Sequence, residues 1–418
     1  MKIGILTIGN ELTSGMIQDT NSSYIARQVQ IQGWTISSML SVGDSEEMIR
    51  EALGFLLARS NAAIVTGGLG PTADDITTQA IANTFRVPLY TDEEVLGEIR
   101  SRFERFRIEW TPNNAKQAMF PEGARTIFNP TGTAWGFAFD WEGRLIAVIP
   151  GVPAEVRRMF PEGVMPLLKK LSGSAEHVLT REIRLFGISE SKIDQTVAKI
   201  DLALPGIGIG FYPRFPENQI VISSRNSSYE EAERNLQAAA ERICGALAKY
   251  VYAYDGDTIE KTIAALLTAK GLSLAVAESL TGGLVTDRLT DVPGSSLFLD
   301  RGIVAYSNRC KTDVLGVPEE VLRTRGAVSE ETAVLMAEGV RKLAGTDFGL
   351  STTGIAGPSG GSADKPVGTV FIALAGGGKT VCRRFAFRWD RRRIKEITTH
   401  WSLEMLRRRL TGEEEHGG

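Results

Sequence analysis

The chain is predicted to be an α/β protein with two mostly parallel sheets and a smaller α+β unit between them. Short apolar runs alternate with amphipathic segments in the first 170 residues and again after residue 256, which favours strands covered by helices on both faces. The 418 residues are too many for one hydrophobic core. We therefore expect three domains, at residues 1–170, 175–253 and 256–412.

The N-terminal region shows the clearest alternation. Residues 3–8 form an apolar run typical of a buried strand, and residues 45–57 have helical spacing with Ser45 as an N-cap signal. Two further apolar runs, at residues 62–66 and 145–149, predict strands of the same sheet.

A glycine-rich loop follows the strand predicted at residues 62–66. Glycines at a strand end let the backbone approach phosphate oxygens, and the helix expected at residues 76–85 would point its N-terminus at the same place. Neither the Walker nor the Rossmann spacing is present. A tight turn is the alternative, but the sequence favours a ligand site, with candidate residues Gly67, Gly68, Gly70 and Thr72.

Two acidic residues end this loop. We expect Asp74 and Asp75 in the first turn of the following helix, where they would cap it, bind a hydroxyl or hold a hydrated divalent metal. Asn10 and Glu11 follow the first strand. Because neighbouring strand ends share one crevice in a doubly wound sheet, they are expected to face the same ligand. The turn-rich segment 129–136 is a weaker candidate for the same site.

The remaining helices are predicted from charge and spacing. A surface helix is expected at residues 229–247, another helix at 258–269 and a final one near 391–410. The basic runs at 391–393 and 407–409 are expected to lie on a solvated face of that last helix. His400, at its centre, is expected to pack or face solvent and not to catalyse.

The most informative segment runs from Ser273 to Asp291. An apolar strand at 272–277 is followed by Glu278 and Ser279, then by the turn Thr281-Gly282-Gly283 and a helical pattern. A serine at such a junction lies beside backbone N–H groups and a helix N-terminus, which suits acyl transfer. An ordinary N-cap is an equally weighted alternative.

A base for this serine has to come from residues other than histidine, because only three histidines occur in the chain. Tyr306 and Lys311 follow a predicted strand at 302–306, and each can act as a base if its pKa is lowered. A Ser-Lys or Ser-Tyr arrangement is therefore favoured over a Ser-His-Asp triad. A small-residue loop with Thr353 and Gly354 follows another predicted strand and is a second candidate ligand loop.

Composition limits the partners. The net charge is −3, with 47 basic and 50 acidic residues, so no general attraction to nucleic acid or anionic membrane is expected. No apolar run has the length of a membrane span. Three scattered cysteines suit a reducing compartment, and we expect a cytoplasmic homodimer.

Taken together, these motifs resemble the CinA family of competence- and damage-inducible proteins. The resemblance rests on three motifs: Gly67-Gly-Leu-Gly-Pro-Thr-Ala-Asp-Asp75, Ala277-Glu-Ser-Leu-Thr-Gly-Gly283 and Ser351-Thr-Thr-Gly-Ile-Ala-Gly-Pro358. The resemblance implies a doubly wound molybdopterin-binding-like domain at the N-terminus and a nicotinamide-nucleotide amidase domain at the C-terminus. Two residues depart from the family pattern, Leu280 for a usual Cys and Trp135 for a usual Pro.

The resemblance also implies activities and roles. It implies deamidation of nicotinamide mononucleotide by Ser279, with Lys311 and Tyr306 as base and proton relay and no cofactor. It places Thr353 and Arg393 in the nucleotide pocket. For the N-terminal domain it implies an ADP-ribose pyrophosphatase that depends on a divalent metal, with potassium as an optional second ion.

Two other interpretations stay open at this stage. The N-terminal domain could transfer a nucleotide to a pterin, because that chemistry also needs a glycine loop around phosphate. The whole chain could instead be a non-enzymatic adaptor in competence or DNA repair. The presence of Ser279, Lys311 and Tyr306 together argues against the adaptor.

Overall fold

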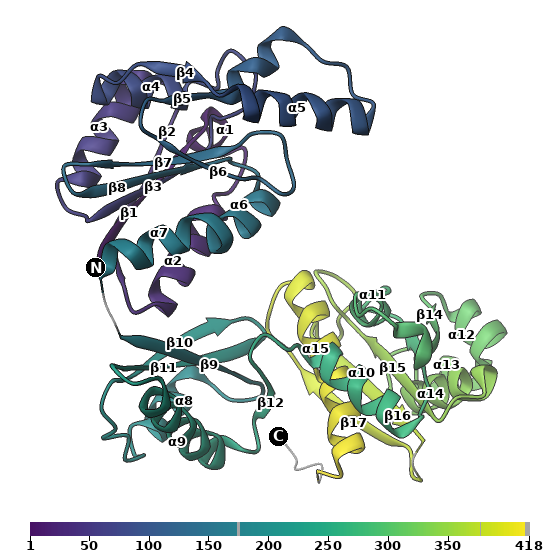
Figure 1. The fold of residues 1–418 in the computed structure, drawn as a ribbon. Coiled ribbons are helices and arrows are strands. Elements are labelled where there is room, and N and C mark those ends of the chain that lie inside the picture. Colours follow the sequence, from purple (N-terminus) through teal and green to yellow (C-terminus); the bar gives the residue numbers. More distant parts are fainter. Residues whose placement is uncertain (174–175, 377, 414–418) are drawn as a thin grey trace. The chain divides into compact units, whose positions relative to one another are not determined.

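The computed structural model describes residues 1–173, 176–376 and 378–413. Its N-terminal part contains a six-stranded sheet in the order β2-β1-β3-β8-β7-β6 (Figure 1). The strands are β1 (Lys2–Ile8), β2 (Thr35–Val42), β3 (Ala62–Thr66), β6 (Arg125–Ile127), β7 (Gly136–Trp141) and β8 (Arg144–Ile149). Strands β2, β1, β3 and β8 run parallel, whereas β7 and β6 continue the sheet antiparallel, so the expected parallel sheet has an antiparallel edge.

Helices cover both faces of this sheet, which explains its uninterrupted apolar strands. Along β3, Ala63 and Val65 pack into one core, and Ala62 and Ile64 pack into another. The first core is completed by α3 (Glu46–Leu57), α4 (Thr77–Phe85) and α5 (Glu93–Phe106), and the second by α2 (Asn21–Ile31), α6 (Pro153–Met159) and α7 (Met165–Ser172). A strand buried on both sides has no polar face to alternate with.

Short elements connect these layers. They are α1 (Asn10–Thr13), a two-stranded ladder of β4 (Leu89–Thr91) and β5 (Met119–Pro121), the 3-10 helix η1 (Pro112–Ala118) and a π-helical turn, η2 (Phe160–Val164). The predicted cap of α3 is confirmed, since the Ser45 side chain accepts a hydrogen bond from the backbone N–H of Met48.

The middle region forms a sheet of its own, as expected for a separate α+β unit. The strand order is β10-β11-β9-β12, and two helices pack on one side of it (Figure 1). The elements are β9 (His177–Leu185), α8 (Glu190–Val197), β10 (Ile207–Arg214), β11 (Glu217–Asn226), α9 (Tyr229–Leu247) and β12 (Val251–Tyr254). The helix predicted at 229–247 is confirmed with the same bounds.

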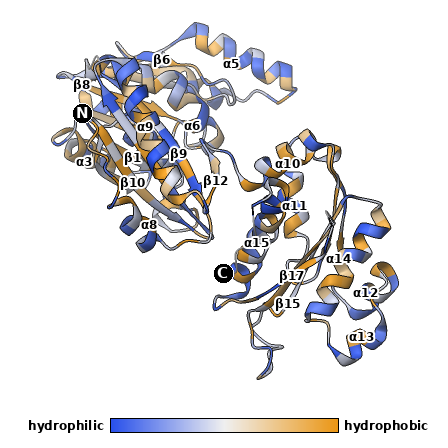
Figure 2. Cartoon of the chain, turned by 90° about the horizontal axis from the view of Figure 1, so that it is seen from below, coloured by the Kyte–Doolittle hydropathy of each residue, from blue (hydrophilic) through white to orange (hydrophobic). Residues whose placement is uncertain are grey.

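The C-terminal part contains a five-stranded sheet in the order β14-β13-β15-β16-β17. Its first three strands are parallel and its last two antiparallel. The strands are β13 (Leu274–Glu278), β14 (Leu299–Val304), β15 (Phe348–Gly354), β16 (Thr369–Ala375) and β17 (Val381–Ala386). In Figure 2 the central strand β1 of the N-terminal sheet carries mostly the apolar colour, as a strand buried on both faces should.

Helices again cover both faces of the C-terminal sheet. One face packs against α10 (Ile259–Lys270), α11 (Leu284–Thr290) and α15 (Arg391–Thr411). The other packs against α12 (Asn308–Leu315), α13 (Glu319–Thr324) and α14 (Glu330–Ala344), and the 3-10 turn η3 (Ser295–Leu297) precedes β14. The α/β class predicted from the sequence is therefore confirmed.

Of the two basic runs of helix α15, residues 391–393 are exposed as expected, whereas the run at 407–409 differs from the expectation of a solvated face. Arg407 and Arg408 are 4% and 6% exposed, and both donate hydrogen bonds to the buried carboxylate of Glu404. His400 is fully buried with its ring 4.1 Å from that of Phe186, which confirms a packing role. A run of basic residues indicates a solvated helix face only when no buried carboxylate lies one helical turn away. Here Glu404 is such a carboxylate, and it pairs with both arginines.

Candidate functional site

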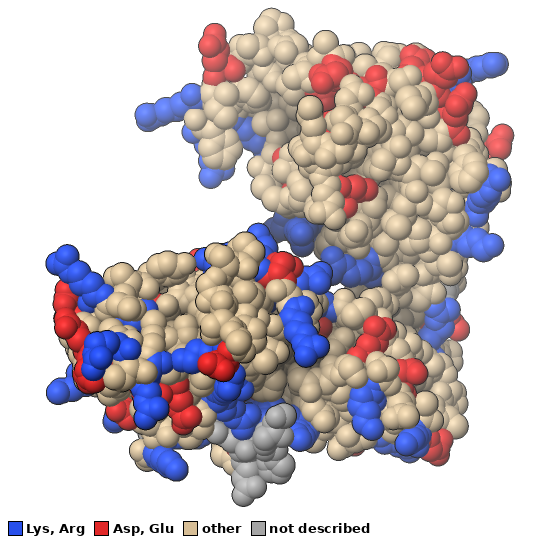
Figure 3. Space-filling model, turned by 180° about the vertical axis from the view of Figure 1, so that it is seen from behind, with Lys and Arg blue, Asp and Glu red and all other residues tan. Residues whose placement is uncertain are grey.

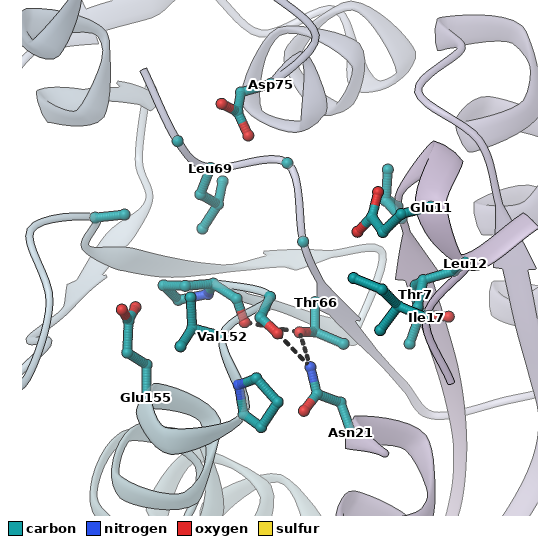
Figure 4. A pocket seen from close by; sticks show the side chains of 18 of the residues that line it. Thr7, Glu11, Leu12, Ile17, Asn21, Thr66, Leu69, Asp75, Val152 and Glu155 are labelled. Carbon is teal, nitrogen blue, oxygen red and sulfur yellow. Dashed lines mark hydrogen bonds between the residues drawn. The ribbon is translucent and has the colours of Figure 1, made fainter. Parts of the chain in front are cut away.

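A cavity of about 470 Å³ lies at the carboxyl ends of β1, β3 and β8 in the N-terminal domain (Figure 4). Five predicted residues line it: Glu11, Gly67, Gly68, Gly70 and Asp75. The crevice expected from the strand order is therefore present. Three other predicted residues, Asn10, Thr72 and Asp74, are not among its lining residues. Asn10 instead exchanges two hydrogen bonds with Asp44, at 2.9 and 3.2 Å.

The first two glycines of the loop are required by close contacts with the chain itself. Gly67 and Gly68 have φ of 111° and 66°, a region that favours glycine. A Cβ on Gly67 would lie 2.1 Å from the carbonyl oxygen of Ile8, and one on Gly68 would lie 2.1 Å from Oγ1 of Thr77. The loop is thus folded tightly over the end of β1, where its backbone forms part of the cavity wall.

Asp74 and Asp75 do not lie in the first turn of a helix, so that prediction is wrong. Helix α4 begins only at Thr77. The Asp75 carboxylate accepts hydrogen bonds from the backbone N–H of Thr72, at 2.9 Å, and from the Thr72 hydroxyl, which also contacts Asp74. These side-chain bonds close a local turn, so the helix begins after it. Short polar side chains often form such turns in place of the first helical hydrogen bonds. The bond from Thr72 also lowers the pKa of Asp74.

The carboxylates near this cavity suit a hydrated cation better than a closed metal site. Burial raises the pKa of Asp44, and the negative charges of Glu11, Asp74 and Asp75 raise it further, so these four acids share one region. Among residues 1–173, 176–376 and 378–413, no group of three or more His, Cys, Asp or Glu is placed to hold a metal. A magnesium-like ion that keeps several waters needs only one or two carboxylates.

The segment 129–136 borders the same cavity through Thr133 and Ala134. The segment begins at the buried Asn129, whose Oδ1 accepts two backbone N–H bonds and whose Nδ2 donates to Glu155 at 2.7 Å. Glu155 lines the cavity, and burial raises its pKa. Sequence reasoning missed Glu155, because nothing in the local pattern of α6 marks it. Trp135 packs its ring 5.1 Å from that of Phe128 and is not a lining residue.

The C-terminal domain brings Ser279 and Lys311 together. Ser279 follows β13, is 9% exposed, and donates its backbone N–H to the Thr352 carbonyl of β15. The Nζ of Lys311, on α12, lies 3.3 Å from its Oγ. Lys311 is only 1% exposed, and its Nζ also donates to the carbonyls of Ala305 and Tyr306, at 2.8 and 3.1 Å. Burial lowers the pKa of Lys311.

The turn after Ser279 is held by a buried carboxylate. Glu278 accepts hydrogen bonds from the backbone N–H groups of Gly283, Val285 and Thr286 and from the Thr286 hydroxyl. The N-terminus of α11 is therefore already satisfied. In the described part of the chain, the N–H groups of Leu280 and Thr281 have no acceptor, which leaves them as the donors beside Ser279.

The backbone carbonyl of Tyr306 contacts Lys311, whereas its side chain points toward Arg391 and solvent. The side chain is 61% exposed, and its hydroxyl accepts a hydrogen bond from Arg391 at 3.2 Å. Arg391 also donates to the Gly357 carbonyl at 2.8 Å, in the glycine-rich loop after β15. Arg393 instead lies over the ring of Phe215, 5.2 Å from its centroid. Arg391, which was not among the predicted site residues, is therefore the arginine that contacts Tyr306 and the glycine-rich loop.

The other predicted residues of this site are mostly buried in the framework. Thr281 and Thr352 share a hydrogen bond of 2.7 Å, and Thr353 donates its hydroxyl to the Ala327 carbonyl at 2.6 Å. Gly354 pairs with β16, and Gly282 is the exposed member of the turn. A Cβ on Gly282 would lie 3.5 Å from Nζ of Lys395, so α15 brings a lysine side chain next to the turn.

These folds and sites define a three-domain α/β protein with a cavity in its first domain and a buried serine–lysine pair in its last. Family models match in the same order: "Probable molybdopterin binding domain" at residues 4–170, "Damage-inducible protein CinA KH domain" at 180–253 and "CinA C-terminal domain" at 256–410. The chain belongs to the CinA family.

Two full-length relatives agree with this assignment, and one solved structure is similar to part of the chain. A "CinA-like protein" of Syntrophus aciditrophicus is 55% identical over 412 residues, 98% of each chain. A "Putative competence-damage inducible protein" of Desulforudis audaxviator is 41% identical over 97% of this chain and 98% of its own. A crystal structure of competence/damage inducible protein CihA from Agrobacterium tumefaciens is 43% identical and covers 35% of this chain and 91% of that chain, with a TM-score of 0.35.

The surface charge and the helix composition can be compared with the predictions about nucleic acid and membranes. Figure 3 shows basic and acidic side chains interspersed on one face of the protein, in keeping with 47 basic and 50 acidic residues. None of the helices in the described part of the chain combines the length and the apolar composition that crossing a membrane requires.

Proposed function

We propose that the C-terminal domain hydrolyses the carboxamide of nicotinamide mononucleotide to nicotinate mononucleotide and ammonia. The observation that carries this proposal is the buried pair of Lys311 and Ser279, with Nζ and Oγ 3.3 Å apart. A carboxamide is a poor electrophile, so its attack needs an activated nucleophile. A lysine amine activates serine only when it is neutral, and burial of Lys311 favours the neutral form.

The contacts of Lys311 fit a neutral amine. Such an amine has two hydrogens and one lone pair, and the carbonyls of Ala305 and Tyr306 accept two donors. The lone pair is then left for the hydroxyl proton of Ser279. Oγ attacks the amide carbon, Lys311 takes the proton and returns it to the leaving ammonia, and water then cleaves the acyl-enzyme. The N–H groups of Leu280 and Thr281 are the candidate oxyanion donors.

The test of the amidase is ammonia release from nicotinamide mononucleotide by the full-length protein and its Ser279→Ala variant. The expected result is loss of nearly all turnover in the variant, with an unchanged melting temperature. Full ammonia release by Ser279→Ala would refute covalent catalysis and point to a directly activated water.

We further propose that the N-terminal cavity binds ADP-ribose and cleaves its pyrophosphate to AMP and ribose 5-phosphate. The carrying observation is a cavity of about 470 Å³ that joins the Gly67–Gly70 loop to the carboxylates of Glu11 and Asp75. A divalent cation, when bound, would neutralise phosphate charge there. Glu11 and Asp75 would hold it through its waters, while the loop backbone positions the phosphates.

The matched pair Asp75→Ala and Asp74→Ala tests this second activity. Asp75 lines the cavity and Asp74 does not. AMP release from ADP-ribose, measured with several divalent metals and with or without potassium, should be abolished in Asp75→Ala and largely kept in Asp74→Ala. Ammonia release should stay intact in both. Absence of AMP release by the wild-type protein with every metal would overturn the proposal and favour the pterin interpretation.

A further inference from the structure

The N-terminal cavity has a buried amide in its wall that no predicted role uses. Gln117 lies on η1, lines the cavity and is 6% exposed. Its Oε1 is buried and accepts no hydrogen bond from any residue the structure describes. Leaving a buried amide oxygen without a donor is unfavourable, and native proteins rarely do so without a reason.

The neighbouring polar residues of η1 are all satisfied, so the amide is not needed to hold this helix. Asn113 donates to the Pro71 carbonyl at 3.2 Å, and Lys116 donates to the Thr72 carbonyl at 2.9 Å. The Nδ2 of Asn114 donates to both the carbonyl oxygen and the hydroxyl oxygen of Thr111. These bonds fix η1 against the Gly67–Asp75 loop and leave Gln117 in the cavity wall with no donor for its Oε1.

An amide carries a donor and an acceptor side by side. The 6-amino group of adenine and its neighbouring ring nitrogen present the complementary pair, which is why glutamine and asparagine read adenine with two hydrogen bonds elsewhere. The terminal torsion of glutamine is soft, so the amide can turn its edge toward a ligand. Apolar lining residues such as Leu69 and Val152 provide surface for the face of a base (Figure 4).

The acidic groups of the cavity leave room for a base. In Figure 4, Glu155 lies on the side opposite Glu11, with Leu69 and Val152 between them. The phosphates belong near the glycine loop and near Glu11 and Asp75, where a cation would be held. We propose that Gln117 recognises the adenine base of the nucleotide bound in this cavity. The proposal rests on the ADP-ribose function proposed above and adds the residue that selects the base.

The test compares two ligands and two proteins by calorimetric titration of the full-length chain. The ligands are AMP and purine riboside 5′-monophosphate, which lacks only the 6-amino group. The variant is Gln117→Met, which keeps the length of the side chain but removes the amide. Wild type should bind AMP about 10-fold more tightly than the purine analogue, whereas Gln117→Met should bind the two equally and AMP about 10-fold more weakly than wild type does.

Stability without ligand separates recognition from a structural role. Because Gln117→Met removes an unpaired buried amide, its melting temperature should equal or exceed that of wild type. A structural amide would instead lower it when removed. Asn113→Ala is the matched control on η1: it removes a bond to the loop but touches no lining residue, so its preference for AMP should stay that of wild type.

The outcomes keep this proposal apart from the pyrophosphatase. If Gln117→Met keeps the wild-type preference for AMP, or wild type binds both ligands equally or neither, the role of Gln117 is refuted. Adenine selection that depends on Gln117, without AMP release from ADP-ribose, would support the base site and refute only the hydrolysis. ADP-ribose cleavage with an unchanged KM in Gln117→Met would support the hydrolysis and refute the role of Gln117 in binding the base.

Discussion

Lys311 Nζ lies 3.3 Å from Ser279 Oγ and is held there by two backbone carbonyls, in a side chain that is 1% exposed. The two residues are 32 positions apart, on the β13 end and on α12. Both carbonyls come from the segment between β14 and α12, so the position of the amine is set by the backbone and not by another flexible side chain. Such an arrangement suits a base that must be positioned before substrate binds.

The first prediction concerns the pH dependence of ammonia release. Burial lowers the pKa of Lys311 from its ordinary value of 10.5, and only the neutral amine accepts a proton. The value of kcat/KM should therefore rise with pH and level off above the pKa of Lys311, which should lie below 10.5. Lys311→Met should lower turnover by at least about 1000-fold, within the range that a general base contributes. Lys311→Met with wild-type turnover would show that Lys311 is not the base.

Much of this site followed from local sequence, and the rest did not. The strand, the turn and the following helix placed Ser279 correctly, because period and glycine content are local signals. That Lys311, and not one of the other lysines, meets Ser279 depends on β14 pairing beside β13, which no local pattern encodes. The expectation that Lys311 acts on Ser279 came instead from the resemblance to the CinA family.

The predictions from sequence were wrong where a nearby side chain takes the hydrogen bond that the expected structure needed. Asp74 and Asp75 were expected to start a helix, but Thr72 closes a turn with them first. The backbone N–H groups of the turn Thr281-Gly282-Gly283 were expected to lie free beside Ser279, but Glu278 already accepts the Gly283 N–H. In both cases a carboxylate a few residues away takes the hydrogen bond, and only the folded geometry shows which partner it takes.

The second prediction distinguishes the arginines at the start of α15. Arg391 joins the Tyr306 hydroxyl to the Gly357 carbonyl, whereas Arg393 lies over Phe215. Arg391→Ala should raise KM for nicotinamide mononucleotide by about 10-fold or more, because it removes a charged donor from the predicted nucleotide side of the site. Arg393→Ala should change KM less. Steady-state kinetics decide between them, and the reverse order would restore the role that the family resemblance gave to Arg393.

The third prediction concerns Tyr306. Its hydroxyl faces Arg391 and solvent, and its carbonyl, not its phenol, contacts Lys311. Tyr306→Phe keeps that carbonyl, so kcat should fall far less than in Lys311→Met, by less than about 10-fold. A loss of kcat as large as that of Lys311→Met would show that the phenol relays the proton in the enzyme–substrate complex.

The fourth prediction is that Glu278 stabilises the turn of the serine loop. Its buried carboxylate accepts three backbone N–H bonds and one hydroxyl bond, and hydrogen bonds to a charged group are among the stronger ones. Glu278→Ala should lower the free energy of unfolding by at least about 3 kcal/mol, because it leaves the start of α11 buried without acceptors. Asp287→Ala, on the exposed side of the same helix, should cost about 0.5 kcal/mol or less. Urea unfolding measures both, and equal effects would contradict the capping role.

The last prediction concerns His400 and acid stability. Its ring is fully buried, and neither nitrogen has a partner within the described residues. Burial lowers the pKa of His400 well below its ordinary value of 6.5, and the nearby charges of Arg288 and Arg184 lower it further. Those arginines are themselves paired with Glu260 and Glu217, so no carboxylate is left to stabilise a charged imidazole.

The sign of the effect follows from proton uptake. Below pH 6.5 the unfolded chain protonates His400 and the folded chain does not, so stability is lost as pH falls, by up to about 1.4 kcal/mol per pH unit. His400→Phe should remove this component, so that its advantage over wild type grows between pH 6.5 and 5.5 in urea unfolding followed by circular dichroism. Parallel pH profiles for wild type and His400→Phe would show that the imidazole is protonated in the folded protein after all.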